Sequence, residues 1–261
     1  MEIDPAFDPP PVEIVNPDAT LPLLLIGDHA GRAVPRAMDN LGLGADAFGR
    51  HIAWDIGAAG VARGVAERRG ASAVLATYTR LLIDPNRPLG DPDCIPTRSD
   101  GIPIPGNQSL TPRDLEARAA ACYWPYHGAI DLALARLSRN GATPVLLSVH
   151  SFTPALMSAG SARPWHAGVM ASRDRRFADA LLAALGAQPG LVTAFNEPYS
   201  GITHGYCLKA HGLAQGIPHA QIEIRQDLIC TPAGEAWWAD LLARVLPAIM
   251  ADPALQRPEH Y

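Results

Sequence analysis

The stretch LLLIGDHAG, residues 23–31, joins four aliphatic residues directly to polar and small ones. A short, continuous aliphatic run of this kind is typical of a fully buried strand, and α/β sheets bind ligands where such strands end. Two more stretches carry polar residues in a similar place. PVLLSVHS at 144–151 runs into His150, and HAQIEIR at 219–225 alternates isoleucines with polar side chains. We therefore expect a sheet whose strand ends carry the functional side chains.

Strands and helices alternate along almost the whole chain. The other expected elements are strands at 72–76, 80–84 and 165–171, and helices at 46–69, 111–141, 174–185, 204–214 and 232–251. Thr111 suits the N-cap of the helix at 111–141, which Pro125 should kink, and the Pro-rich residues 88–110 suit a long irregular loop. This order predicts a single α/β domain over residues 20–261, built on a mixed, mostly parallel sheet with helices on both faces. Residues 1–19, with five prolines, should form an extended N-terminal arm.

Composition excludes several classes of protein. The 261 residues hold 26 acidic and 21 basic side chains, a formal net charge of −5, with no basic run to attract nucleic acid or an anionic membrane. The longest aliphatic stretch, Leu21 to Ile26, is far shorter than the ~20 residues that cross a bilayer, and the acidic N-terminus lacks a signal-peptide pattern. A cytoplasmic protein is expected. Its four cysteines form no C-x-x-C pair and should be buried or half-buried thiols.

Two histidines and a carboxylate form a candidate metal site. His29 and His150 stand at strand ends, and Asp55 projects from the helix predicted after the first strand. Two imidazoles and one carboxylate are a common catalytic zinc shell, because they leave a fourth position for water. Each histidine could instead be a hydrogen-bonded structural residue. His51, four residues before Asp55 on the same predicted helix face, competes as ligand or as supporting partner.

The strand at 219–225 predicts a polar row. Gln221, Glu223 and Arg225 share one face under the two-residue period of a strand. In a central strand such charges must face a solvated cleft or a satisfied network, whereas in an edge strand they would lie in water. Beside a metal, Glu223 would act as general base and Arg225 as a clamp for a carboxylate.

Two arginines and an amide surround one predicted turn. Arg80, Asn86 and Arg87 flank the short strand at 80–84. Guanidinium groups bind carboxylates through paired hydrogen bonds, so this set suits a small acidic molecule. A local salt bridge between Asp84 and Arg87 is the simpler alternative.

Six motifs, in this order over about residues 20–250, resemble the N-formylglutamate amidohydrolase family. They are His29-Ala30-Gly31, Arg80 with Asp84-Pro85-Asn86-Arg87, Pro125-Tyr126-His127, Ser148-Val149-His150-Ser151, Asn196-Glu197-Pro198-Tyr199-Ser200-Gly201, and Ile222-Glu223-Ile224-Arg225. The resemblance implies a phosphorylase/hydrolase-like α/β fold, similar to zinc carboxypeptidases and to deacylases of N-acyl aspartate and succinylglutamate. It also implies zinc-dependent hydrolysis of an amide.

The resemblance carries metal ligands onto this chain. His29 and His150 match the two histidine ligands, and Asp55 occupies the place of the carboxylate ligand. Carboxypeptidases place a glutamate three residues after the first histidine, where this chain has Arg32, so His51 stays in contention as the third ligand. Zinc is the implied metal, and the same shell would hold cobalt or manganese.

The resemblance also carries catalytic and substrate-binding roles. Glu223 matches the catalytic glutamate, and Asn86 with Arg87 matches the pair that holds the substrate carboxylate. Arg80 or Arg225 would stabilise the oxyanion that develops on the carbonyl.

The implied reaction is hydrolysis of N-formyl-L-glutamate to formate and glutamate. One alternative is a zinc deacylase or carboxypeptidase-like hydrolase of another N-acyl amino acid or a small peptide. The other is a binding protein that keeps the cleft without a metal. Neither the oligomeric state nor the role of residues 88–110 can be predicted.

Overall fold

Seven strands form one sheet in a computed structural model that describes residues 3–155 and 163–261. They span Val12–Val15 (β1), Leu23–Gly27 (β2), Ser72–Ala76 (β3), Val145–Phe152 (β6), Ala167–Met170 (β7), Thr193–Phe195 (β8) and His219–Arg225 (β9). Their order across the sheet is β1-β3-β2-β6-β9-β7-β8. β1 is antiparallel to β3 and β7 to β9, whereas the other four pairs are parallel. The predicted mixed, mostly parallel sheet is confirmed.

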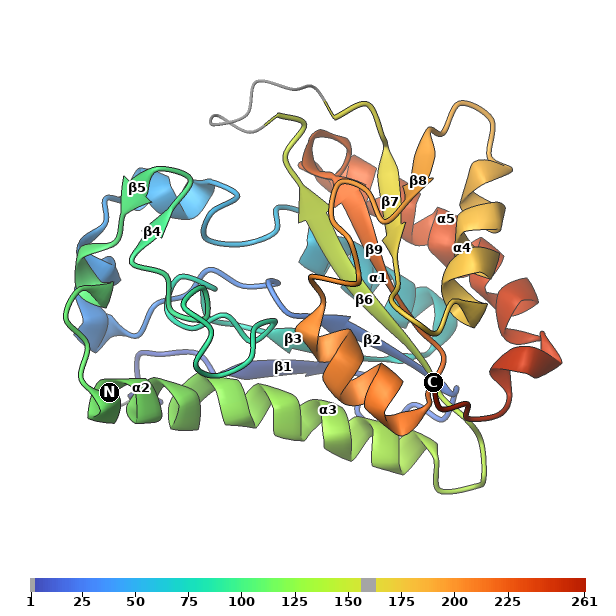
Figure 1. The fold of residues 1–261 in the computed structure, drawn as a ribbon, viewed down its shortest axis with the longest axis horizontal. Helices are drawn as coiled ribbons and strands as arrows, with labels where there is room; N and C mark the ends of the chain where they lie inside the picture. The colour runs from blue at the N-terminus through green and yellow to red at the C-terminus, as the bar shows by residue number, and fades with distance from the viewer. Residues whose placement is uncertain (1–2, 156–162) are drawn as a thin grey trace.

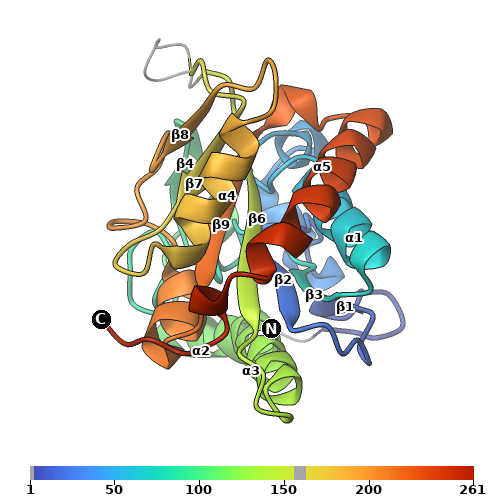
Figure 2. The ribbon, with the colours of Figure 1, turned by 90° about the vertical axis from the view of Figure 1, so that its right-hand side faces the viewer.

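Helices cover both faces of this sheet (Figures 1 and 2). The α-helices of the described chain are Ala58–Arg69 (α1), Pro112–Arg118 (α2), Trp124–Leu137 (α3), Arg176–Gly186 (α4) and Pro232–Met250 (α5). Alternate residues of β2 show the two layers. Leu23 and Leu25 belong to a core with α1, α4 and α5, whereas Leu24 and Ile26 pack with α3 on the opposite face. The central strands are therefore buried on both sides, as their continuous aliphatic runs predict.

The three strands that carry the candidate residues are neighbours. β2, β6 and β9 lie side by side and run parallel. His29 follows β2, while His150 and Glu223 lie near the ends of β6 and β9. Because parallel strands end at the same edge of a sheet, these side chains meet there.

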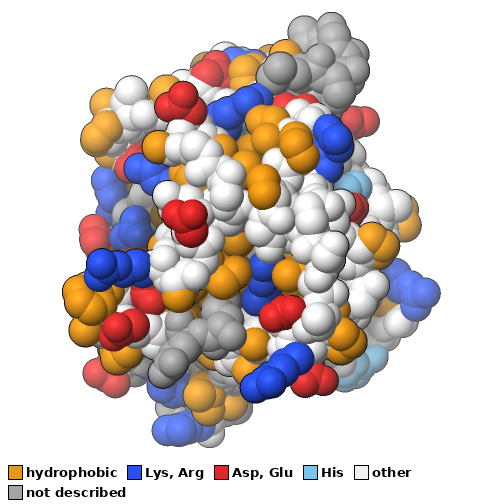
Figure 3. All heavy atoms as spheres, turned by 90° about the vertical axis from the view of Figure 1, so that its left-hand side faces the viewer, with side chains coloured by type: hydrophobic (Ala, Val, Ile, Leu, Met, Phe, Trp, Pro, Cys, Tyr) orange, Lys and Arg blue, Asp and Glu red, His pale blue; other side chains and the backbone are white. Residues whose placement is uncertain are grey.

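A third apolar cluster supports the connections at this edge. Residues 88–110 are not wholly irregular: they contain a short hairpin of Arg98–Ser99 (β4) and Ile102–Pro103 (β5), on the left of Figure 1. Ile104 from this loop packs with Leu81 and Tyr123. Figure 3 shows the face over β4 and β5, where acidic and basic side chains are interspersed.

One predicted element is wrong in its first half and another is wrong throughout, and the residues concerned pack in that third cluster. The helix expected over 46–69 begins only at Ala58, so His51 and Asp55 lie in the connection before α1 rather than on a helix face. Residues 80–82 form a turn and residues 83–84 are irregular, so no strand forms there. In both stretches the apolar side chains, such as Ile52 and Leu82, pack into the cluster and imitate a helical or strand pattern.

The long helix at 111–141 is interrupted rather than continuous. Thr111 caps α2 as predicted, with its side chain accepting from the Asp114 amide. A π-helical turn at Ala119–Tyr123 separates α2 from α3, and Pro125 lies in the first turn of α3. The wider turn relieves the clash that a proline produces inside a regular helix.

Smaller expectations also change. Part of the N-terminal arm, Val12–Val15, is the edge strand β1. The segment expected as a helix at 204–214 contains a π turn at Leu208–Gly212 and a 3₁₀ turn at Leu213–Gln215. Cys230 is exposed, whereas the other three thiols are buried. Among the described helices, none is long and apolar enough to span a membrane.

Candidate active site

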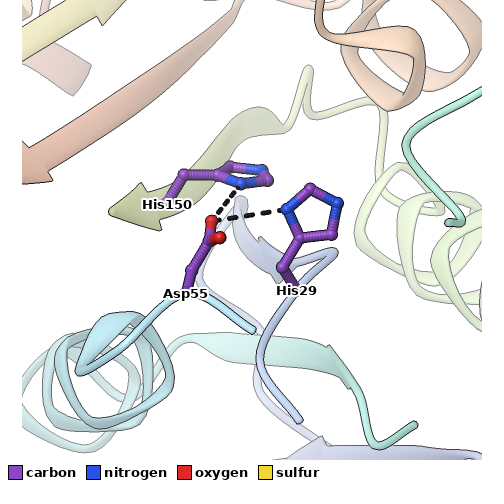
Figure 4. Close-up of side chains that lie close together, drawn as sticks. All are labelled: His29, Asp55 and His150. Carbon is purple, nitrogen blue, oxygen red and sulfur yellow. Dashed lines mark hydrogen bonds and ion pairs between the residues drawn. The ribbon is translucent and has the colours of Figure 1, made fainter. Parts of the chain in front are cut away.

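His29, Asp55 and His150 meet at the edge of the sheet (Figure 4). Asp55 Oδ2 lies 2.7 Å from His150 Nδ1 and 3.4 Å from His29 Nδ1. All three residues are buried, and one ligand atom from each lies within 4.8 Å of the others. Three segments that are distant in sequence thus bring two imidazole nitrogens and one carboxylate oxygen close enough together to bind one metal ion.

Each imidazole is fixed from behind by a buried aspartate. His29 Nε2 lies 2.8 Å from Asp84 Oδ1, and His150 Nε2 lies 2.8 Å from Asp28 Oδ2. Burial, the largest single influence, raises the pKa of Asp28, but the hydrogen bonds from His150 and Tyr126 and the charges of the two histidines together hold that pKa well below its usual range. In this structure a carboxylate, which accepts when ionised, faces both nitrogens of each ring, so Nδ1 and Nε2 both donate and, despite burial, the pKa of each imidazole is raised by these acidic neighbours. A bound cation would take the place of the Nδ1 protons, while the Nε2 protons would stay on Asp84 and Asp28.

This arrangement fits a divalent cation. Two imidazole nitrogens and a carboxylate oxygen converge, and each histidine has the carboxylate partner that metal-ligating histidines generally have. His51 takes another position: its Nε2 faces Asp100 Oδ2 at 3.6 Å, and its side chain is 25% exposed. Asp55, rather than His51, therefore completes the cluster.

A cavity of about 200 Å³ opens beside the cluster. Its walls include four of the residues predicted for catalysis or substrate binding, namely Arg80, Asn86, Arg87 and Glu223. Arg80 is held there by Asp84 Oδ2 at 2.7 Å and faces Asp55 Oδ1 at 3.8 Å. Its guanidinium is thus oriented by Asp84, which also contacts His29, and by the candidate ligand Asp55.

Asn86 and Arg87 present donors to this cavity. The side-chain oxygen of Asn86 accepts the backbone N–H of Cys207 at 3.0 Å, which leaves the amide NH₂ for a ligand. Among the described residues, the Arg87 guanidinium has no hydrogen-bond or ion-pair partner, so the alternative of a salt bridge with Asp84 does not form. A half-buried, unpaired guanidinium is a ready partner for a carboxylate.

Glu223 stands opposite the cluster on β9. Its Oε1 accepts from Gln221 Nε2 at 2.6 Å, whereas its buried Oε2 has no partner among the described residues. Burial raises the pKa of Glu223 to about 7. A carboxylate with one tethered oxygen and one open oxygen is suited to proton transfer near neutral pH.

Arg225 does not join them. It is the last residue of β9, outside the cavity lining, and its guanidinium pairs with Asp227 at 2.8 Å. The polar row expected from the alternation thus reaches the cavity only through Gln221 and Glu223.

Other lining or supporting residues had no predicted role. Asp28 and Asp84 orient the histidines, and Tyr199, His204 and Gln221 line the cavity. Asp28 directly precedes the quoted motif that begins at His29, and Asp84 opens the motif that contains Asn86 and Arg87. The usual need of a ligating histidine for a second partner was the signal that could have identified them.

Comparison with known proteins gives consistent matches. The sequence profile of the N-formylglutamate amidohydrolase family matches residues 21–230. No curated protein sequence matches the chain. Among solved structures, gene product Atu2144 from Agrobacterium tumefaciens is similar, with 33% identity, a TM-score of 0.89, and coverage of 95% of this chain and 98% of that one. The N-formylglutamate amidohydrolase from Ralstonia eutropha JMP134 shares the fold, with 22% identity, a TM-score of 0.67, and coverage of 92% and 96%.

Proposed function

The chain belongs to the N-formylglutamate amidohydrolase family, and we propose that it hydrolyses N-formyl-L-glutamate to formate and glutamate with a zinc ion held by His29, Asp55 and His150. One observation carries the proposal. Two imidazole nitrogens, each backed by a buried aspartate, converge with a carboxylate oxygen beside Glu223. Cobalt or manganese would suit the same donors.

A divalent cation, when bound, would supply Lewis acidity that polarises the formyl carbonyl and lowers the pKa of a water molecule. The protein supplies the proton transfers. Glu223 takes one proton from the attacking water, and the new C–O bond forms as the carbonyl carbon becomes tetrahedral. The same carboxyl then returns the proton to the nitrogen as the C–N bond breaks, so the amine leaves in neutral form.

Three donors in the cavity wall orient the substrate. Arg87 and the Asn86 amide would bind a substrate carboxylate, since both have hydrogen-bonding capacity that the described residues leave unused. Arg80, fixed by Asp84, would stabilise the developing oxyanion. The cavity volume of about 200 Å³ suits a small N-acyl amino acid.

A substrate panel with defined metals tests this proposal. Protein stripped with a chelator is reloaded with zinc, cobalt or manganese and assayed for release of carboxylic acid from N-formyl and N-acetyl amino acids. We expect metal-dependent formate release, fastest from N-formylglutamate. A preference for an N-acetyl amino acid or peptide would favour the related deacylase, and absence of both bound metal and activity would favour a binding protein.

A further inference from the structure

Helix α3 carries two neighbouring side chains, Tyr126 and His127, that are buried outside the catalytic cavity. We infer that this pair is a positioning device for both halves of the site: Tyr126 orients the metal ligand His150, and His127 orients the substrate-binding segment 84–87. The inference rests on the proposed function. It is carried by two separate chains of hydrogen bonds that begin on adjacent residues.

The first chain runs from Tyr126 to His150. The Tyr126 hydroxyl donates to Asp28 Oδ1 at 2.7 Å, and Asp28 Oδ2 accepts from His150 Nε2 at 2.8 Å and from Ser148 Oγ at 3.1 Å. Burial and the charge of Asp28 raise the pKa of Tyr126 well above its usual range, so the phenol keeps its proton. Tyr126 therefore orients the carboxylate that accepts from His150 Nε2.

The second chain runs from the surface to the substrate-binding segment. His127 Nε2–H donates to the Pro85 carbonyl at 3.1 Å, which leaves Nδ1 as the acceptor for His211 Nε2 at 2.7 Å. His211 Nδ1 in turn lies 2.8 Å from Asp131 Oδ1, and the Asp131 side chain is 59% exposed. A proline has no backbone N–H, so the carbonyl is the one backbone group through which Pro85 can form hydrogen bonds; the Cys207 thiol also contacts it at 3.2 Å.

Pro85 connects two functions. Its neighbour Asp84 binds His29 Nε2, and Asn86 and Arg87 line the cavity. Displacement of Pro85 should therefore disturb both the metal site and substrate binding. Displacement of Asp28, which accepts from Tyr126, Ser148 and His150 and also meets the Cys207 thiol, should disturb the metal site more than substrate binding. The two arms, which are the hydrogen-bond chain from Tyr126 and the one from His127, should thus differ in their effects on metal affinity and on substrate binding.

Conservative variants separate these signatures. Tyr126→Phe should weaken zinc affinity about 10- to 100-fold and alter the visible absorption of the cobalt-loaded protein, with KM unchanged. His127→Phe should weaken zinc affinity and also raise KM for N-formylglutamate. His127→Gln, whose amide can donate near the position of Nε2, should restore most of both.

The matched control is Tyr78→Phe. Tyr78 is also buried, and its hydroxyl donates to the Pro9 carbonyl at 2.6 Å, away from the cavity. This variant should lose some thermal stability without a change in zinc affinity, cobalt spectrum or KM. Zinc affinity is measured by competition with a chromogenic chelator, so this readout does not depend on turnover.

The outcomes distinguish the inference from the proposed function. A wild-type protein that binds no metal and hydrolyses no formyl amino acid overturns the function. If wild type is active but Tyr126→Phe matches Tyr78→Phe, the first arm is wrong. If His127→Gln behaves like His127→Phe, ring packing explains the effect and the second arm is wrong. Should both His127 variants fail to fold, Asp131→Asn on the exposed end must still raise KM, and an unchanged KM overturns that arm.

Discussion

Glu223 is the cross-strand partner of His150 in the parallel pairing of β9 with β6. Paired residues of neighbouring strands point to the same face of a sheet, so the proposed general base and a proposed metal ligand stand next to each other on rigid elements. The spacing between base and metal site is thus set by strand register rather than by a loop. Rigid placement of this kind supports precise proton transfer.

Replacement of Glu223 by Gln should abolish turnover but preserve binding. The amide cannot accept the proton of the attacking water, and general base catalysis contributes roughly 10²- to 10⁴-fold, so kcat should fall by about that factor. Formate release measures kcat, while metal analysis and calorimetry with N-formylglutamate check that both ligands still bind. Arg225→Gln, on the same strand but outside the cavity, serves as the control and should keep near-native kcat. Near-native hydrolysis by Glu223→Gln would refute the mechanism.

Metal removal should lower the thermal stability of the protein. A variant that no longer gains stability from zinc identifies the third metal ligand. A cation present at about 100 times its Kd stabilises the folded state by about 2.7 kcal/mol. For a chain of this size that corresponds to a rise in Tm of roughly 5–10 °C on zinc addition to the stripped protein. Differential scanning fluorimetry should show this rise for wild type and His51→Gln but not for Asp55→Asn. The reverse pattern would make His51 the ligand instead.

Loss of the Arg87 guanidinium should weaken substrate binding more than it slows the chemistry. Hydrogen bonds to charged groups are worth about 1.5–3 kcal/mol, so Arg87→Ala should raise KM roughly 10- to 150-fold with a smaller change in kcat. Arg87→Lys should recover little, because an ammonium cannot form the paired hydrogen bonds of a guanidinium. Arg225→Ala is again the control. Steady-state kinetics with N-formylglutamate decide the matter, and an unchanged KM in Arg87→Ala would remove this residue from the substrate site.

The sequence predicted the centre of the sheet well because its signals are local there. The aliphatic runs before His29 and His150 can bury both faces only as central strands, and HAQIEIR forms β9 at the expected residues. The errors lie where tertiary packing overrides local pattern. Apolar residues such as Ile52 and Leu82 mark burial in the third cluster, not a helix or a strand.

The site could be predicted in its parts but not in its connections. His29 and His150 stood out because a polar residue at the end of a buried strand is unusual, and the family motifs added Asn86 and Arg87. Arg225 continued the alternation of β9, yet the strand ends there and its side chain turns to Asp227. The chains of hydrogen bonds from α3 join residues about 40 to 100 positions apart, and no periodicity reports such contacts.

Acid should destabilise the metal-free protein through His127. Burial lowers the pKa of this imidazole to about 4, below the 6.5 of an unfolded histidine. Between those values the unfolded chain binds a proton that the folded chain does not, so stability falls as the pH falls from about 6.5 to 4. From pH 7 to pH 5 the loss from this group should be about 2 kcal/mol.

His127→Gln removes this titrating group, so it isolates the effect. Metal-free wild type and variant are unfolded in urea at pH 7 and pH 5, and the variant should lose about 2 kcal/mol less between the two pH values. Other buried histidines, such as His219, titrate in both proteins and cancel in the comparison. Well above pH 7 the His127 imidazole is neutral in both the folded and the unfolded chain, so the stability of the two proteins should depend on pH in the same way there. An equal loss of stability in both proteins at pH 5 would mean that His127 is protonated in the folded state. His127 Nδ1 would then donate to His211 Nε2, whereas the bonds to the Pro85 carbonyl and the Asp131 carboxylate would keep their directions because these oxygens only accept.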